Sequence, residues 1–175
     1  MEYRDVYTRD GKPLNRVKEK HEKPEPGEYF RHALVIMKTE DSPAPGQGEG
    51  LYIMQQRSLK ARFFPGMWDA TGGGVRHGET AAQAAVREVR EELGIELDEA
   101  RLTRSWDFVS EWGNDTGLLV TVFACRAKAP AGGFPFDPTE VNDVKVVPYG
   151  LFAEKMREHN DDDFARELES VERTI

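Results

Sequence analysis

The sequence contains a single cysteine, Cys125, which follows the apolar run 118–124. One cysteine excludes an intrachain disulfide, and a thiol at the edge of an apolar run is predicted to be buried and structural. No apolar run reaches the length that a membrane-spanning helix needs. The first five residues also lack the apolar core of a signal peptide, so we expect a cytoplasmic protein without a membrane partner.

Positive charge is scarce as well. The chain has 24 Lys and Arg residues against 32 Asp and Glu residues, which gives a formal net charge of -8. Because Lys and Arg supply most of the affinity for phosphate backbones, this balance argues against general nucleic-acid binding. Small anionic substrates remain compatible with it, provided that metal ions neutralise them locally. The length of 175 residues suits one domain with a full core and leaves no room for a second catalytic domain.

Strands and helices are predicted to alternate irregularly along the chain. A hairpin is expected from segments 5–8 and 14–17 around the turn 10–13, followed by a charged connector to residue 27. Further strands are expected at 33–38, 51–56, 102–111, 118–126 and 144–148, and helices near 80–93, 151–158 and 163–171. This order suggests an α/β sandwich with a mixed sheet. We expect one globular unit, with residues 1–27 as hairpin and connector and residues 28–175 as the main domain.

The segment from Gly73 to Ile95 is the most informative part of the chain. A glycine-rich loop leads into the predicted helix 80–93, which carries Glu88, Glu91 and Glu92. Residues three and four apart lie on one face of a helix, so the three carboxylates converge. Like charges repel one another, so this placement requires a compensating cation. Hard oxygen ligands of this kind suit Mg²⁺ or Mn²⁺.

The other side of the same helix carries an apolar stripe. Its members are Ala82, Ala85, Val86, Val89 and Leu93. The stripe predicts that the acids point away from the core, toward solvent or a cleft, and it places Ala84 on the polar side. Gly94 stands where a left-handed C-terminal cap is wanted. For the short Arg-Glu-x-x-Glu-Glu string alone, a solvated acidic face is the better interpretation.

A longer pattern reverses that interpretation. The segment reads Gly, five residues, Glu, seven residues, then Arg-Glu-aliphatic-x-Glu-Glu-x-Gly-aliphatic. The matching residues are Gly73, Glu79, Arg87, Glu88, Val89, Glu91, Glu92, Gly94 and Ile95. This resembles the signature of the Nudix hydrolase superfamily, and the flanks Gln56-Arg57, Phe64-Pro65-Gly66 and Trp68-Asp69 extend the likeness over about residues 29–152. Segments 5–15 and 28–32 resemble the branch related to isopentenyl-diphosphate isomerase.

The resemblance implies a Nudix-type α/β/α sandwich with a mixed β-sheet, with helices on both faces. It also implies a hydrolase that uses Mg²⁺ or Mn²⁺ to cleave a diphosphate linkage in a small molecule of the nucleoside diphosphate-X type. Nucleoside triphosphates, nucleotide sugars, dinucleoside polyphosphates and oxidised nucleotides all offer that linkage, so the sequence does not choose among them. The N-terminal hairpin leaves a homodimer open.

Within the motif, the resemblance assigns the metal ligands. Glu88 and Glu92 are the principal ligands, Glu91 is a further ligand or the base for the attacking water, and the backbone carbonyl of Gly73 is an additional ligand. Glycine permits the close approach that a backbone ligand requires. The residues expected to take part in catalysis are Glu91, Glu92, Arg87 and Glu140.

Other residues are expected to assist from around the motif. Arg87 and Glu79 support the ligands, because a guanidinium can orient carboxylates bidentately. Glu140 supplies another ligand or the base, although an exposed loop glutamate is an equal alternative. Arg57 is expected to meet substrate phosphate. For Lys60 and Arg62 a solvated role is favoured, and Trp68, Trp106 and Trp112 are core residues more often than a stacking surface for a base.

Two other interpretations remain. An isomerase of the related branch needs a cysteine after the Phe-Pro-Gly-x-Trp turn, whereas residues 69–74 contain none. That isomerase also lacks the complete acidic box that is intact in this sequence. A non-catalytic Nudix-fold binding or regulatory module usually loses one or more box acids, whereas this chain keeps all of them. Hydrolysis is therefore the favoured activity.

Overall fold

The computed structural model describes residues 2–61 and 64–175. The strands are β1 (Tyr3–Tyr7), β2 (Pro13–Glu19), β3 (Tyr29–Thr39), β4 (Leu51–Arg57), β5 (Trp68–Asp69), β6 (Thr71–Gly74), β7 (Thr103–Gly113), β8 (Thr116–Ala127) and β9 (Val141–Pro148). The helices are α1 (Ala81–Leu93), the short η1 (Glu99–Arg101), α2 (Tyr149–Arg157) and α3 (Asp162–Thr174). Each predicted strand and helix is present, and the core strands are longer than predicted.

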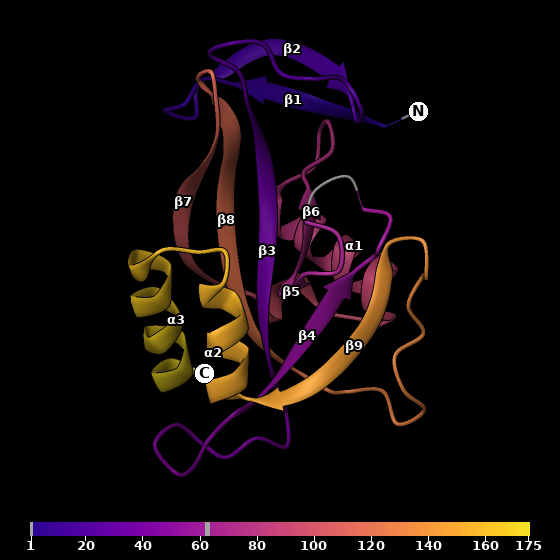
Figure 1. Cartoon of the computed structure of the whole chain (residues 1–175), viewed down its shortest axis with the longest axis vertical. Helices are drawn as coiled ribbons and strands as arrows, with labels where there is room; N and C mark the ends of the chain where they lie inside the picture. The colour runs from indigo at the N-terminus through magenta and orange to yellow at the C-terminus, as the bar shows by residue number, and fades with distance from the viewer. Residues whose placement is uncertain (1, 62–63) are drawn as a thin grey trace.

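One mixed sheet organises the molecule around β3 (Figure 1). β3 pairs in parallel with β8 and antiparallel with β1, β4 and β6. β7 pairs with β8, while β5 and β9 pair with β4. The predicted N-terminal hairpin is formed by β1 and β2 and joins this sheet through β3. The division at residue 27 stays a prediction.

The sheet separates where β4 leaves β3. The two strands pair only at Met37↔Ile53 and Lys38↔Tyr52, and Figure 1 shows β4 and β9 running away from β3 at an angle. Beyond this point β6 pairs with β3 and β5 pairs with β4. Residues on β4, β6 and α1 can therefore approach one another at the opening between the two halves of the sheet.

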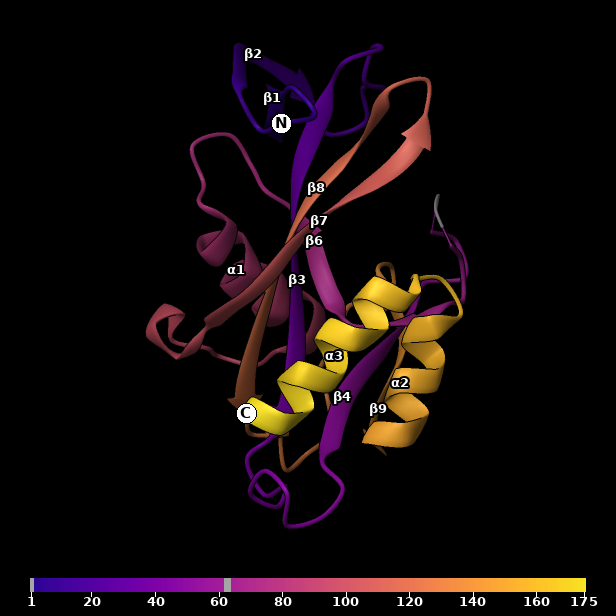
Figure 2. The same cartoon turned by 90° about the vertical axis from the view of Figure 1, so that its left-hand side faces the viewer.

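Helices cover both faces of the sheet, as Figure 2 shows. Because successive strand residues point to opposite faces, Val35 and Met37 pack in the cluster beneath α1, whereas Leu34 and Ile36 pack in the cluster beneath α2 and α3. This confirms the predicted α/β/α sandwich. Cys125 is 3% exposed within the α1-side cluster, and burial raises its pKa to about 11, as expected of a structural thiol. No helix in the described ranges is both long enough and apolar enough to cross a membrane.

Helix α1 has the predicted ends but a wider buried surface than predicted. Thr80 and Gln83 form a capping box, and Gly94 adopts the left-handed conformation with φ of 65°. Ala84, however, is fully buried, so its assignment to the polar side is wrong. The physical reason is that α1 contacts both β3 and β6, and a helix covered from two directions buries more than its apolar stripe.

Candidate active site

Three carboxylates from two distant segments meet beside α1. Glu88 and Glu92 come from the helix, and Glu140 comes from the turn before β9; one oxygen of each lies within 4.8 Å of the others. We call these three residues the acid cluster. Glu88 and Glu92 are only 9% and 6% exposed, whereas Glu140 is exposed. The cluster therefore has a buried floor and one side open to solvent.

Burial makes the ionised form of this cluster costly. Burial raises the pKa of Glu92 to about 8, and the negative charges of Glu88 and Glu140 raise it further. The hydrogen bond from Gln55 acts in the opposite direction. Burial also raises the pKa of Glu88, although Arg87 opposes the shift. The acids were expected to point toward solvent or a cleft, and Glu88 and Glu92 face the partly open acid cluster rather than bulk solvent. Closely spaced, desolvated carboxylates of this kind fit a hard divalent cation such as Mg²⁺ or Mn²⁺.

Gly73 lies directly against the cluster. Gly73 belongs to β6 and pairs with Ala33 of β3. A Cβ atom on Gly73 would lie 2.1 Å from the carboxyl carbon of Glu88. A real side chain would therefore push the carboxylate away. This requirement for glycine is consistent with the close approach that a backbone ligand at Gly73 needs.

Arg87 ties the loop before α1 to the cluster. Its Nε and Nη2 donate to the two carboxylate oxygens of Glu79 at 2.8 and 2.9 Å, and its Nη1 donates to Glu88 at 2.6 Å. Its Nη2 also donates to the carbonyl of Gly74 at 3.0 Å. Burial raises the pKa of Glu79, but hydrogen bonds from Arg87 and from the backbone of Arg76 outweigh it, and the pKa is lowered. The network holds Glu79 ionised and fixes the position of Glu88.

Glu91 does not join the close group formed by the other three acids. Its side chain is 39% exposed and accepts from Arg76 at 3.3 Å and from Arg87 at 3.2 Å. Adjacent residues on a helix diverge by about 100°, so Glu91 and Glu92 project in different directions. Glu92 projects toward Gln55 of β4, and Glu140 completes the cluster on that side.

Comparison with known proteins agrees with the sequence motif and with the fold. Residues 29–168 match the model of the NUDIX domain. The chain belongs to the NUDIX family. The Arabidopsis thaliana Nudix hydrolase 3 is 28% identical over 158 residues, which are 85% of this chain and 19% of that protein. The Enterobacter nucleoside triphosphatase NudI is 40% identical over 62 residues, 35% of this chain and 43% of its own length. This Nudix chain thus spans less than half of either relative.

Solved structures share the Nudix fold at low sequence identity. A Deinococcus radiodurans protein superimposes with a TM-score of 0.67 and 19% identity, covering 97% of this chain and 99% of that one. A Caenorhabditis elegans Ap4A hydrolase superimposes with a TM-score of 0.58 and 18% identity, covering 80% and 93%. These likenesses establish the fold alone.

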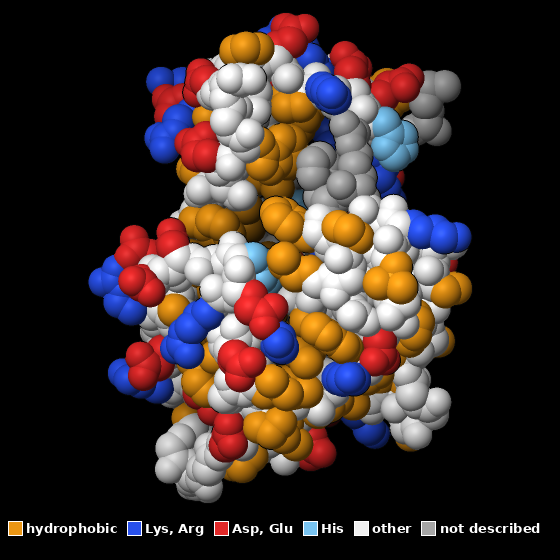
Figure 3. Space-filling view, viewed as in Figure 1, with side chains coloured by type: hydrophobic (Ala, Val, Ile, Leu, Met, Phe, Trp, Pro, Cys, Tyr) orange, Lys and Arg blue, Asp and Glu red, His pale blue; other side chains and the backbone are white. Residues whose placement is uncertain are grey.

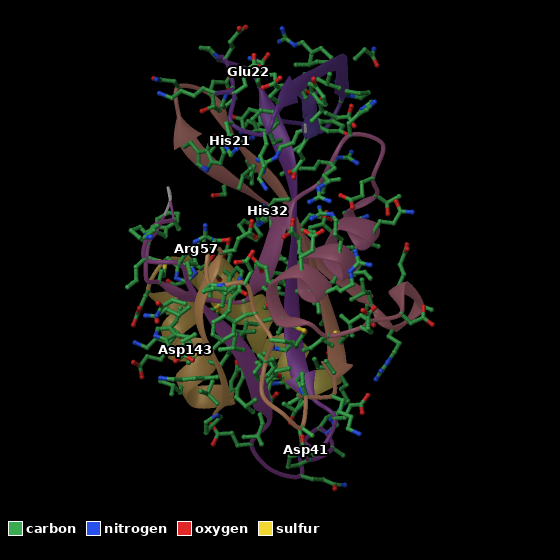
Figure 4. All side chains as sticks on the ribbon, turned by 90° about the vertical axis from the view of Figure 1, so that its right-hand side faces the viewer. His21, Glu22, His32, Asp41, Arg57 and Asp143 are labelled. Carbon is green, nitrogen blue, oxygen red and sulfur yellow. The ribbon has the colours of Figure 1, made fainter. Side chains whose placement is uncertain are left out.

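Arg57 lies near the cluster of the Nudix chain, at the end of β4. Burial raises the pKa of Glu92, and the positive charge of Arg57 partly opposes this rise. Burial lowers the pKa of His32, and the charge of Arg57 acts in the same direction. Figure 4 shows Arg57 and His32 closer to one another than either is to Asp143. Lys60 is exposed in the loop after β4. Arg62 lies outside the described residues.

Sequence reasoning missed two neighbours of the Nudix motif. Gln55 is 1% exposed, and its Nε2 donates to Glu92 at 2.7 Å. The available signal was an amide that directly follows the apolar run 51–54 inside a predicted strand. Arg4 lies over Gly74, where a Cβ atom would be 2.6 Å from its guanidinium carbon. Nothing in the sequence linked the N-terminal hairpin to the motif loop.

Adjacent glycines of the Nudix motif are expected to respond differently to alanine. Gly73→Ala displaces only the flexible carboxylate end of Glu88, so the fold should persist. Affinity for Mn²⁺ should fall about tenfold or more, as it does when a group that orients a metal ligand is disturbed. Gly72→Ala instead places a Cβ atom 2.4 Å from the carbonyl oxygen of Ala33 and should lower the melting temperature strongly.

Calorimetric titration with Mn²⁺ and thermal melting measure the two effects. Gly132→Ala is the control, because nothing lies within 4 Å of a Cβ atom there. Wild-type Mn²⁺ affinity in Gly73→Ala would contradict the role of Gly73 beside Glu88.

Proposed function

We propose that this Nudix protein is a Mg²⁺- or Mn²⁺-dependent hydrolase that cleaves a diphosphate linkage in a nucleoside diphosphate-X type substrate. The observation that carries the proposal is the acid cluster itself. Helix α1 and the turn before β9 bring together three carboxylates, two of them buried, at a cost that a bound cation removes. The NudI relatives are called nucleoside triphosphatases, which fits a substrate with linked phosphates.

In this proposal Glu88 and Glu92 would hold the cation, with the carbonyl of Gly73 as a further ligand and Glu140 as a late ligand or the base. A bound divalent cation neutralises phosphoryl oxygens and lowers the pKa of water. The oxygen of water forms a bond to one phosphorus while the bond from that phosphorus to the bridging oxygen breaks. The bridging oxygen leaves with the electron pair, and a glutamate takes the proton of the water.

The remaining residues position these groups. Arg87 and Glu79 hold Glu88, and Arg57 binds a substrate phosphate near Glu92. Glu140 is the preferred base or late ligand, because it is the exposed member of the cluster. Glu91, more distant and paired with two arginines, is the alternative base or an extra ligand.

The rival activities draw no support from the geometry. An isomerase would need a reactive thiol, whereas Cys125 is 3% exposed in the α1-side core and burial raises its pKa. A module that only binds would have no need for two buried box acids in addition to Glu140. Kinship with the isomerase branch, a cytoplasmic location and a homodimer stay predictions.

A screen of diphosphate compounds with Mg²⁺ or Mn²⁺, read as phosphate or pyrophosphate release, tests the activity. We expect turnover that chelator abolishes. Glu140→Gln should lower kcat by about tenfold or more while KM changes little, because the group acts mainly in the transition state. Its exposed position should leave the melting temperature unchanged.

Asp143→Asn is the matched control, since Asp143 lies on β9 outside the acid cluster. Wild-type kinetics in Glu140→Gln would return Glu140 to the status of a solvated loop residue and leave Glu91 as the base. Absence of metal-dependent turnover on every diphosphate would reject the hydrolase.

A further inference from the structure

The loop between β6 and α1, residues 75–80, is fastened at its middle by β1. We call this loop the motif loop. The backbone N–H of His77 donates to the carbonyl of Tyr3 at 2.8 Å. One carboxylate oxygen of Asp5 lies 2.8 Å from Nδ1 of His77, and the other accepts from the N–H of Gly78 at 3.3 Å. Across the part of the chain that the structure describes, every hydrogen bond of His77 and Gly78 thus goes to β1.

The sheet pairing explains this contact, because β1 and β6 share one edge of β3. β8 pairs with β3 along Tyr29–Thr39 and so occupies the opposite edge. β1 pairs at Tyr29 and Phe30, and β6 pairs farther along, from His32 to Val35. Both strands run antiparallel to β3, so the start of β1 and the end of β6 are brought to the same stretch of this edge. β1 therefore meets the motif loop where the loop leaves β6.

The N-terminal hairpin adds little to the core. Among the described residues of β1 and β2, Val6 is the one buried hydrophobic side chain, and it belongs to neither core cluster. Figure 3 shows Lys, Arg, Asp and Glu side chains at the upper end of the molecule, where Figure 1 places β1 and β2. The match to the NUDIX domain covers residues 29–168 and so begins after the hairpin. β1 thus contributes more to the motif loop, through polar contacts, than to the core.

The motif loop leads directly to the acid cluster. Glu79 follows Gly78, and its two carboxylate oxygens accept from Arg87 at 2.8 and 2.9 Å. Arg87 in turn donates to Glu88 at 2.6 Å. Because Glu88 is one of the proposed cation ligands, a displacement of the loop at Gly78 would move the partner that orients Arg87, and with it the ligand.

β1 also contacts the start of the motif loop. Arg4 lies over Gly74, where a Cβ atom would be 2.6 Å from its guanidinium carbon. The carbonyl of Gly74 accepts from Arg87 at 3.0 Å. Glu2 pairs with Arg76 at 3.2 Å. The first residues of β1 therefore touch the loop on both sides of the point that Asp5 holds.

We propose that Asp5 is a positioning residue for the metal site. It fixes the motif loop at His77 and Gly78, and through Glu79 and Arg87 this holds Glu88 where a divalent cation requires it. The inference rests on the proposed metal-dependent function and adds to it a residue outside the matched NUDIX domain. Asp5 is not a member of the acid cluster, so it acts through the geometry of the loop.

Hydrogen exchange in chelator, followed by NMR, tests the fixing of the loop without metal. In wild type the N–H of Gly78 and the Nε–H of Arg87 should exchange slowly, because each is donated to a carboxylate. Asp5→Ala should speed both exchanges about tenfold or more, as expected when a charge-assisted hydrogen bond is lost. The melting temperature should stay near that of wild type, because the hairpin adds little to the core.

Titration with Mn²⁺ tests the consequence for the metal site. Asp5→Ala should weaken binding about tenfold, the range for loss of a group that orients a metal ligand from outside. Asp5→Asn should restore most of the affinity, because its amide oxygen can accept from Gly78 while its nitrogen donates to the other tautomer of His77. An effect of charge alone would instead leave asparagine as weak as alanine.

A double-mutant cycle identifies the route. In Glu79→Ala protein the connection to Glu88 is already broken, so adding Asp5→Ala should change Mn²⁺ affinity by less than about twofold. Glu19→Ala is the matched control, because it removes an exposed carboxylate from β2 of the same hairpin. It should bind Mn²⁺ as wild type does.

The two proposals can fail separately. Unchanged exchange of the Arg87 Nε–H in Asp5→Ala, wild-type Mn²⁺ affinity in that variant, or equal weakening with and without Glu79 overturns the positioning role and leaves the hydrolase proposal intact. A melting temperature far below that of wild type would make Asp5 a structural residue and overturn the role as well. If wild type binds no Mn²⁺, the metal-dependent hydrolase is rejected, while exchange in chelator still decides whether Asp5 fixes the loop and Arg87.

Discussion

Glu92→Gln is expected to abolish hydrolysis and, in the same molecule, to stabilise the metal-free protein. Activity should fall by orders of magnitude, because a metal ligand loses its charge. Stability should rise because a neutral amide at this 6% exposed position avoids the burial cost of a carboxylate. The amide oxygen can still accept the hydrogen bond from Gln55. Residues selected for chemistry often reduce stability in this way.

The pH dependence identifies the cause. The pKa of Glu92 rises from 4.5 to about 8 on folding, so between these values the folded state holds a proton that the unfolded state has released. Wild type therefore loses stability as pH rises through this window, whereas the glutamine variant does not. Because one pKa unit corresponds to about 1.4 kcal/mol, the advantage of the variant above pH 8 is on the order of 3 to 5 kcal/mol.

Thermal melting in chelator at about pH 5 and pH 8.5 measures this effect. The two proteins should melt closely together at the lower pH and separate at the higher one. Added Mg²⁺ should stabilise wild type and leave the variant unchanged, because only the protein that binds the ion gains stability from it. Glu167→Gln, an exposed change on α3, is the control. Identical melting of wild type and Glu92→Gln at both pH values would show that Glu92 is not a costly buried acid.

Ala84→Asp and Val89→Asp are both expected to destabilise the protein by about 3 kcal/mol or more, since each places an unpaired charge in a fully buried position. Gln83→Asp adds the same group one residue earlier, at an exposed site in the first turn, where negative charge suits the helix dipole. Its carboxylate replaces the amide oxygen that accepts from the N–H of Thr80 in the capping box, so stability should change by about 1 kcal/mol or less, well below the loss in the two buried variants.

Urea or thermal denaturation of the three variants measures the difference. If Ala84→Asp unfolds at the same denaturant concentration as Gln83→Asp, the contact of α1 with both β3 and β6 is wrong. If only Val89→Asp is destabilised, the narrower apolar stripe that the sequence suggests is the true buried surface.

The features that depend on neighbours along the chain could be predicted from the sequence alone. Turn residues 10–13 and 113–117 predicted the two hairpins, and helical spacing predicted α1. Its predicted cap at Gly94 was confirmed. The spacing of Gly73, Glu79 and the box acids also indicated the family, to which the match over residues 29–168 now assigns the chain. These signals are local, because backbone conformation and side-chain direction within one element follow from residues a few positions apart.

Which acids come together and which residues are buried depends instead on contacts between distant parts of the chain. A helical repeat shows that Glu88, Glu91 and Glu92 share one side, but not that Glu92 projects toward β4 while Glu91 pairs with two arginines. The entry of Glu140 into the cluster depends on how β9 pairs with β4. The burial of Ala84 depends on α1 contacting two strands, and the position of Arg4 depends on β1 joining β3. These contacts join residues far apart in the chain, and their geometry is determined by sheet pairing and packing, which no single stretch of sequence contains.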